Sequence, residues 1–329
     1  AVDIQPGDEV ITTPITWIAT AAAAVVLGAT IKFADVDPTT LNIDPNTCEA
    51  LITPRTKAIC PVHLYGLPVD MAPIMEIAQA HGIKVIEDSA HAPGATYNGT
   101  RTGNIGDVGC FSFHEQKNMS TLGEGGMVTT NDPDLYVRVR SYKSHCTRVI
   151  GKSMKYMTLP DNVAEAALAN GEFWFQDFDD CGYNFRMNDV TATVGICQLA
   201  KLEGLNERRR EVATQFTEGL ASIPGILLPK DAEDATHVYH LYPIQLDPAQ
   251  VNVSRDAFIY TLRADYGIKC GVHYMPLVQT TAFRQRGFTE ADAPIACERW
   301  PQLVTLPIHP RMTDEAVEYL IDSIKTVLS

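Results

Sequence analysis

The chain has 329 residues, 45% hydrophobic and 20% charged, which excludes disorder and provides for one large core or two smaller ones. Its 26 Lys and Arg against 40 Asp and Glu leave a net charge of −14, which repels polyanions and argues against nucleic acid and anionic membranes as partners. The longest apolar stretch, Ile18 to Ala29, is shorter than the roughly 20 residues that span a bilayer.

In the first half of the chain, short β-branched runs alternate with helical stretches. Buried strands are predicted at Val10 to Thr13, Ile31 to Ala34, Ala58 to Val62, Val85 to Glu87 and Cys110 to Phe113. Helical periodicity is found at Trp17 to Leu27, Pro45 to Ile52 and Met71 to His81. This alternation predicts a largely parallel sheet with helices on both faces.

The second half changes character. Gly125 to Thr130 predicts a returning strand, and Asn131-Asp132-Pro133 begins a helix that extends to about Ser144. The further predicted elements are a long helix from Asn188 to Leu220, strands at His240 to Leu246 and Lys269 to Tyr274, and helices at Ser254 to Asp265 and from Thr313 onward. The change from alternating α/β to α+β predicts a large domain at 1–200 and a smaller C-terminal domain at 201–329.

Two ionisable residues follow predicted strands. Parallel sheets bind ligands in the crevice beyond the carboxyl ends of their strands. Lys117 lies four residues past Phe113 and is either a solvated loop lysine or, if it loses its proton through burial, a nucleophile toward a carbonyl. Asp88 is either a cap or turn residue or the charge partner of a bound cationic ring, whose protonated form it would stabilise.

The eight cysteines are scattered along the chain, without a C-x-x-C pair or the spacing of zinc ligands. They predict reduced, mostly packed thiols. No charged segment followed by an apolar one indicates a secretion signal. We therefore expect a cytoplasmic protein without a bound metal.

Five motifs occur in a characteristic order along nearly the whole chain. They are Trp17-Ile-Ala-Thr20, Glu87-Asp-Ser-Ala-His-Ala92, Phe111-Ser-Phe-His-Glu-Gln-Lys-Asn118 with Gly123-Glu-Gly-Gly126, Gly182-Tyr-Asn-Phe-Arg-Met-Asn188 with Gly195-Ile-Cys-Gln-Leu199, and Leu306-Pro-Ile-His-Pro310. In combination they resemble the DegT-type (DegT/DnrJ/StrS) sugar aminotransferases. These are fold type I enzymes that depend on pyridoxal phosphate (PLP).

The resemblance implies a role for six residues. Lys117 would form the Schiff base with PLP, and Asp88 would pair with the pyridinium nitrogen. The other implied cofactor contacts are His91 near the ring and its phenolic oxygen, Trp17 stacked on the ring face, Ser112 at the phosphate, and Asn184 at the phosphate of the neighbouring subunit. The last contact implies a homodimer with shared active sites.

Two features depart from the family pattern. Family members have an upstream segment whose Ser/Thr-containing turn at a helix N-terminus binds the PLP phosphate, so we expect such a segment before Ala1. The aromatic-rich stretch from Arg148 to Asp180 is longer than is common in the family. We expect it to cover the acceptor site and to influence acceptor preference.

By resemblance, the reaction transfers an amino group from glutamate or glutamine to a keto sugar, usually nucleotide-linked, or to a keto cyclitol. Related PLP sugar dehydratases have His at the position of Lys117, which disfavours that activity. Two alternatives stay open at this stage: an aminotransferase for a ketone that is not a sugar, and a catalytically impaired PLP-fold protein with a binding or regulatory role.

Overall fold

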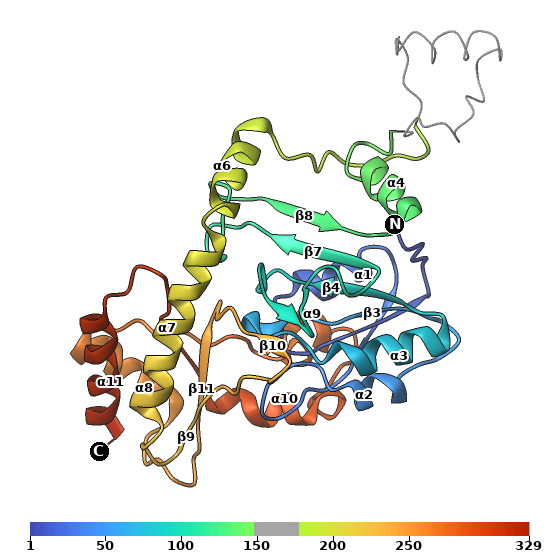
Figure 1. The fold of residues 1–329 in the computed structure, drawn as a ribbon. Helices are drawn as coiled ribbons and strands as arrows, with labels where there is room; N and C mark the ends of the chain where they lie inside the picture. Colours follow the sequence, from blue (N-terminus) through green and yellow to red (C-terminus); the bar gives the residue numbers. More distant parts are fainter. Residues whose placement is uncertain (148–177, 329) are drawn as a thin grey trace, which may run out of the picture.

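The computed structural model describes residues 1–147 and 178–328, arranged as Figure 1 shows. The central sheet has six strands in the order β2-β1-β3-β4-β7-β8, all parallel to their neighbours except β8, which is antiparallel to β7. Its strands are β1 (Glu9–Thr12), β2 (Thr30–Phe33), β3 (Thr56–Cys60), β4 (Lys84–Asp88), β7 (Val108–Ser112) and β8 (Gly126–Thr129). The predicted mixed α/β fold with a mostly parallel central sheet is confirmed.

Helices cover both faces of the central sheet because its strands alternate apolar side chains between two cores. Val10 of β1 packs in one core with α1 (Ala19–Val25), whereas its neighbour Ile11 packs in the other with α3 (Met71–His81). The shorter α2 (Pro45–Ala50) contributes Cys48 to the second core. Both faces of the inner strands are therefore apolar, as expected for a buried parallel sheet.

The second half builds another core on a small antiparallel sheet. The strand β11 (Tyr242–Leu246) lies between β9 (Ile226–Leu227) and β12 (Leu303–Leu306). Three helices pack on it: α7 (Leu202–Leu220), α8 (Arg255–Tyr266) and α11 (Asp314–Leu328). The remaining elements are α4 (Pro133–Tyr142), α6 (Asp189–Leu199), α9 (Thr281–Arg284), α10 (Pro294–Arg299) and a small sheet of β5 (Thr96–Tyr97), β6 (Thr100–Arg101) and β10 (Ala235–Thr236).

Residues 277–303 return from the second half to the first. Leu277, Phe283 and Ala296 belong to the same apolar cluster as Val10 of β1. This segment covers the face of the central sheet that α1 leaves partly open. The predicted division into two domains near residue 200 stays a prediction. Residues 277–303 join the first core although they lie late in the sequence.

Three sequence predictions need correction. The helix predicted from Asn188 to Leu220 is two helices, α6 and α7, separated at Ala200 and Lys201. The helix predicted to begin at Trp17 begins at Ala19, so Trp17 lies before it. Trp17 is 62% exposed in this position.

The strand predicted at Lys269 to Tyr274 is wrong. In this stretch only Gly271 forms a bridge, exchanging backbone hydrogen bonds with Thr305 of β12 at 2.8 and 2.9 Å. The strand that pairs with β11 is β12, which the sequence analysis did not predict. None of the helices in the described residues has the length and apolar character that a bilayer crossing requires.

A buried carboxylate fixes the returning segment. Asp35, 7% exposed, accepts the backbone N–H of Ile295 at 2.7 Å and of Ala296 at 3.0 Å in the first turn of α10. It also accepts the N–H of Val36 at 2.9 Å. Its negative charge is favourable at a helix N-terminus, and its loss would leave these N–H groups without an acceptor.

We expect Asp35→Ala to lower the free energy of unfolding by about 2 to 3 kcal/mol, measured by denaturant titration, because several buried donors lose their acceptor. Asp256→Ala is the control, since Asp256 is 80% exposed in its ion pair with Arg255 and should contribute less than about 1 kcal/mol. Equal losses in the two variants would show that Asp35 does not fix the segment.

Candidate active site

A cavity of about 1000 Å³ lies at the carboxyl ends of β4 and β7. Five of the six residues singled out in the sequence line it: Trp17, Asp88, His91, Ser112 and Lys117. The sixth, Asn184, does not. The position agrees with the rule that open α/β sheets bind ligands beyond the carboxyl ends of their strands.

Lys117 lies in the loop that follows β7. Its backbone N–H donates to the carbonyl of His114 at 2.9 Å, which closes a tight turn. The amine is half-buried, and burial lowers its pKa from the ordinary value, although the nearby carboxylate of Asp88 acts in the opposite direction. A lysine of this kind gives up its proton more readily than one in water.

The next residue anchors this loop to the rest of the protein. Asn118 is 5% exposed, and its Nδ2 donates to Asn206 Oδ1 at 3.0 Å and to the carbonyl of Val238 at 3.1 Å. Because Nδ2 is thus the donor, Oδ1 is the acceptor for the Nδ1–H of His240 at 3.1 Å. The backbone that carries Lys117 is therefore fixed by three buried hydrogen bonds.

Asp88 is the last residue of β4. Its Oδ2 accepts the hydroxyl of Thr20 at 2.6 Å, and its Oδ1 accepts the N–H of Ala90 at 3.0 Å. The hydrogen bond from Ala90 is the one expected if Asp88 stabilises a turn, as the sequence analysis considered. Both donors are uncharged, so neither neutralises the carboxylate. Among the described residues no Lys or Arg forms an ion pair with Asp88. The carboxylate is therefore available to a cationic group in the cavity.

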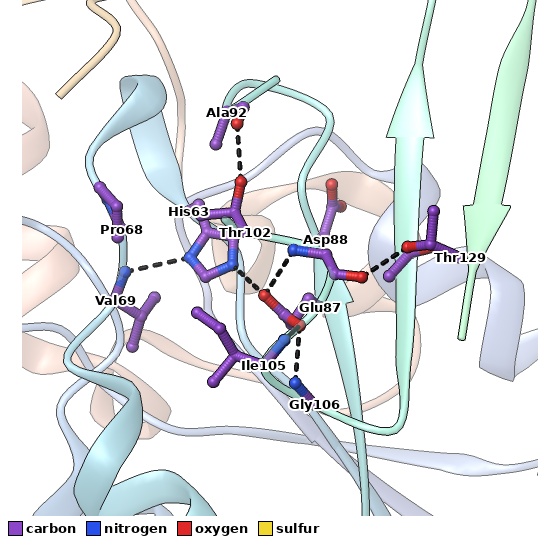
Figure 2. Close-up of polar contacts among 12 residues, drawn as sticks. His63, Pro68, Val69, Glu87, Asp88, Ala92, Thr102, Ile105, Gly106 and Thr129 are labelled. Carbon is purple, nitrogen blue, oxygen red and sulfur yellow. Dashed lines mark hydrogen bonds and ion pairs between the residues drawn. The ribbon is translucent and has the colours of Figure 1, made fainter. Parts of the chain in front are cut away.

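The residue before it, Glu87, is completely buried, and Figure 2 shows its polar contacts. Its carboxylate accepts the backbone N–H groups of Gly103, Ile105 and Gly106, each at 2.7 Å. Burial alone would raise the pKa of Glu87, but hydrogen bonds from His63 and from this backbone lower it overall. The loop 103–106 is thus bound to β4 immediately beside Asp88.

His63 completes this buried network. Its Nδ1 accepts the N–H of Val69 at 3.0 Å, so the ring proton is on Nε2 and is donated to Glu87 at 2.9 Å (Figure 2). The backbone N–H of His63 donates to the carbonyl of Asp88 at 3.1 Å. Glu87 and His63 therefore fix the backbone of Asp88 from both sides of the strand.

His91 packs against a second histidine that the sequence analysis did not select. The ring of His240 lies 4.4 Å from that of His91, centroid to centroid. The Nδ1 of His91 accepts the N–H of Tyr65 at 3.3 Å, so its Nε2 carries the proton and lies 3.3 Å from the hydroxyl of Tyr274. These rings form one wall of the cavity.

Three buried histidines of the cavity wall have lowered pKa values. Burial is the main cause that lowers the pKa of His91 and of His240 well below the ordinary value, and the positive charge of Lys117 adds to it in both. His273 also lines the cavity, and burial followed by Lys117 lowers its pKa. Protonating any of these rings would place another cation beside Lys117 in a site of low polarity.

The remaining predicted residues differ in their surroundings. The ring centroid of Trp17 lies 6.2 Å from that of Tyr274, and Ser112 Oγ accepts the N–H of His114 at 3.3 Å. Asn184 is exposed, on a short bridge with Ser144, away from the cavity of its own chain. Its predicted contact with a neighbouring subunit involves a second chain and stays a prediction.

The sequence analysis missed Thr20, His240, His273, Tyr274 and Arg209 as cavity residues. Thr20 is part of the Trp17 motif, so its position three residues past an aromatic residue could have indicated a cavity side chain. His240 begins a predicted strand and Arg209 lies on the helix predicted from Asn188 to Leu220, and neither position indicates a cavity residue. Long-range packing brings them to the cavity, and local sequence patterns do not encode it.

Fold and cavity together define a fold type I, cofactor-dependent aminotransferase. The whole described architecture superposes on the Streptococcus pneumoniae protein Spr1654 in its PMP form, with a TM-score of 0.86, 30% identity, and coverage of 99% of this chain and 83% of that one. The same protein has also been solved in a PLP form. A profile of the DegT/DnrJ/EryC1/StrS aminotransferase family matches residues 1–325, and the chain belongs to this family.

Two relatives place the chain among proteins of sugar metabolism. It is 38% identical over 326 residues to the spore coat polysaccharide biosynthesis protein SpsC of Bacillus subtilis, covering 99% of this chain and 80% of the relative. It is 36% identical over 329 residues to the UDP-N-acetyl-3-dehydro-alpha-D-glucosamine 3-aminotransferase of Acidithiobacillus ferrooxidans, covering 100% and 80%. The predicted family is confirmed.

The lowered histidine pKa values predict that stability falls in mild acid. Below the ordinary histidine pKa of 6.5, the unfolded chain takes up protons that the buried rings of His91 and His240 cannot accept. Each such ring lowers the free energy of unfolding by up to about 1.4 kcal/mol per pH unit below that value. Stability is therefore complete above pH 6.5 and declines as the pH falls toward 5.5.

Denaturant titrations between pH 7.5 and 5.5 measure this slope, expected to decrease in His240→Gln by about 1.4 kcal/mol per pH unit. The control is His81→Gln, because the ring of His81 is exposed to water in the folded protein and should leave the slope unchanged. A slope that is identical in the wild type and in His240→Gln would contradict a neutral, buried His240.

Proposed function

We propose that the protein is a PLP-dependent aminotransferase that transfers an amino group from glutamate or glutamine to a keto sugar. The observation that carries the proposal is that Lys117, whose pKa is lowered by burial, and Asp88, whose carboxylate forms no ion pair with a described Lys or Arg, line one cavity. Membership of the aminotransferase family supports the same reaction. The cofactor is PLP, which the PLP and PMP forms of Spr1654 support.

The residues of the cavity fit this cofactor. Lys117 supplies the amine for a Schiff base, and Asp88 supplies the carboxylate for a protonated ring nitrogen, with no competing basic partner among the described residues. Trp17 provides an exposed aromatic surface for stacking, His91 a ring N–H for the phenolic oxygen, and Ser112 a hydroxyl for the phosphate. These roles follow the family resemblance, and the shared cavity supports them.

When bound, PLP supplies an electron-poor ring that stabilises negative charge on the carbon beside the amino group. Asp88 keeps the ring nitrogen protonated, and the hydroxyl of Thr20 orients the carboxylate. In the proposed reaction, the Nζ of Lys117 would accept the proton of the donor's α-carbon. The lowered pKa of Lys117 suits this role, because the amine is unprotonated more often than a lysine in water.

The acceptor is a keto sugar, and we propose that it is linked to a nucleotide. The support is the Acidithiobacillus ferrooxidans relative, whose described substrate is a 3-dehydro sugar carried on UDP. A keto cyclitol is the alternative acceptor within the same chemistry. The segment 148–180, expected from the sequence to influence acceptor preference, lies outside the described residues except for 178–180.

We also propose that the enzyme is a cytoplasmic homodimer with shared active sites. Large apolar side chains are exposed around Asn184, and α6 buries none of its residues within the chain. The exposed residues are Leu122 (71%), Tyr183 (74%), Phe185 (70%), Val190 (70%), Ile196 (71%) and Leu199 (61%). A second copy of the chain that covers this surface would place Asn184 near its partner's cavity. For the location, the support is that all eight cysteines are free.

The covalent role of Lys117 is testable by absorption spectroscopy. We expect the wild type with PLP to show a visible band that glutamate or glutamine bleaches, because the cofactor changes from aldehyde to amine. Lys117→Ala should lack the band of the lysine-bound cofactor, whereas Lys143→Ala, which removes an exposed lysine, should retain it. An unaltered band in Lys117→Ala would refute the assignment of this lysine.

Shared active sites predict that two inactive variants restore one another. Lys117→Ala and Asn184→Ala, unfolded together and refolded as a mixture, should regain about a quarter of wild-type activity, because half of the dimers are mixed and each holds one intact site. A mixture of Lys117→Ala and Asp88→Asn is the control, since both residues line the cavity of one chain and no intact site forms. Absence of recovery in the first mixture would contradict the dimer.

A further inference from the structure

A second cavity lies on the other face of the small antiparallel sheet. Side chains alternate along β11, so that Tyr242, Ile244 and Leu246 pack in the core with α7, α8 and α11. Pro243 and Gln245 therefore point to the opposite side, and both line a cavity of about 20 Å³. Among the described residues, none lines both this cavity and the candidate active site.

Both halves of the chain contribute to the walls of this cavity. Leu41 lies between β2 and α2, Tyr65 follows β3, and Leu228 follows β9. Tyr65 also contacts the candidate active site, because its backbone N–H donates to Nδ1 of His91 at 3.3 Å and its hydroxyl donates to the carbonyl of His273. The second cavity is therefore separated from the histidine wall of the first by one residue.

Gln245 brings an acceptor without a donor to the second cavity. The residue is 7% exposed, and its Oε1 is buried and accepts no hydrogen bond from the described residues. A buried amide oxygen without a donor is costly, because it has lost its hydrogen bonds to bulk water. The occupant that best fits the cavity is therefore one that donates to Oε1.

His237 brings a donor to the same cavity. It is 4% exposed, and burial lowers its pKa to about 3, so the ring carries one proton at neutral pH. Its Nδ1 accepts the backbone N–H of Tyr239 at 2.8 Å, which places this proton on Nε2. The described residues offer no hydrogen-bond acceptor to Nε2. The same occupant should therefore also accept a hydrogen bond.

Size and polarity together limit the occupant. An anion could accept from His237 but could not donate to Gln245, and a metal ion could bind Oε1 of Gln245 but could not accept from His237. Water does both, and the cavity of about 20 Å³ exceeds the roughly 10 to 15 Å³ that one water requires. Larger molecules with a donor and an acceptor do not fit this volume.

We propose that the second cavity binds one ordered water, which accepts from Nε2 of His237 and donates to Oε1 of Gln245. Lys230, an exposed residue that also lines the cavity, has an ammonium group that supplies a third hydrogen bond. Three partners are the usual number for a buried water. The water links β11 to the segment that precedes it and fills the space behind Tyr65.

The first test is a crystal structure of the wild type at a resolution that shows ordered waters. A single peak should lie about 2.7 to 3.2 Å from both Oε1 of Gln245 and Nε2 of His237. Gln245→Met keeps the length of the side chain and removes the acceptor, so the peak should be lost. Gln250→Met is the matched control, because Gln250 is exposed and pairs with Asp247, and it should retain the peak.

A second measurement shows whether the water is bound in solution. Magnetic relaxation dispersion of water oxygen-17 counts the long-lived internal waters of a protein. Gln245→Met should hold one such water fewer than the wild type, and Gln250→Met should hold the same number as the wild type.

Several results would overturn the inference. The wild-type crystal could show no peak between the two side chains, or Nζ of Lys230 bound directly to Oε1 of Gln245. Crystals soaked in bromide could show an anomalous peak at this position, which would assign the cavity to an anion. An equal number of long-lived waters in the wild type and in Gln245→Met would contradict the site in solution.

Discussion

The buried carboxylate of Glu87 is the interaction on which the candidate site most depends. It gathers three backbone N–H groups from one loop and the ring proton of His63 at the point where β4 ends. Each of these donors would be costly to bury without an acceptor, so together they specify one conformation. Because Asp88 is the next residue, the same contacts fix the position of its backbone. Its own side chain forms no ion pair with a described Lys or Arg.

The electrostatics of the cavity follow from burial more than from charge pairs. Burial lowers the pKa of His91, of His240 and of Lys117, because removal from water disfavours each positively charged form. Asp88 lines the cavity and forms no ion pair with a described Lys or Arg. Its charge is therefore available to a ligand. The site is therefore prepared for a ligand that brings a positively charged ring.

The sequence predicted the alternating sheet, the family and the cavity residues on the first half of the chain, because strand ends and local motifs determine them. It did not predict that Arg209, His240 and Tyr274 line the same cavity, since their positions depend on packing between distant segments. The run at Lys269 to Tyr274 was mistaken for a strand because it is partly apolar, yet only Gly271 pairs with β12 and no ladder forms.

The return of residues 277–303 to the first core has a consequence for synthesis on the ribosome. One face of the central sheet, including Val10 of β1, receives part of its cover from Leu277 and Phe283, which leave the exit tunnel long after the strands of that sheet. Until then, the nascent chain presents an incompletely covered apolar sheet, the kind of surface that chaperones bind. Native folding of the first half therefore waits for residues 277–303, although its strands are made first.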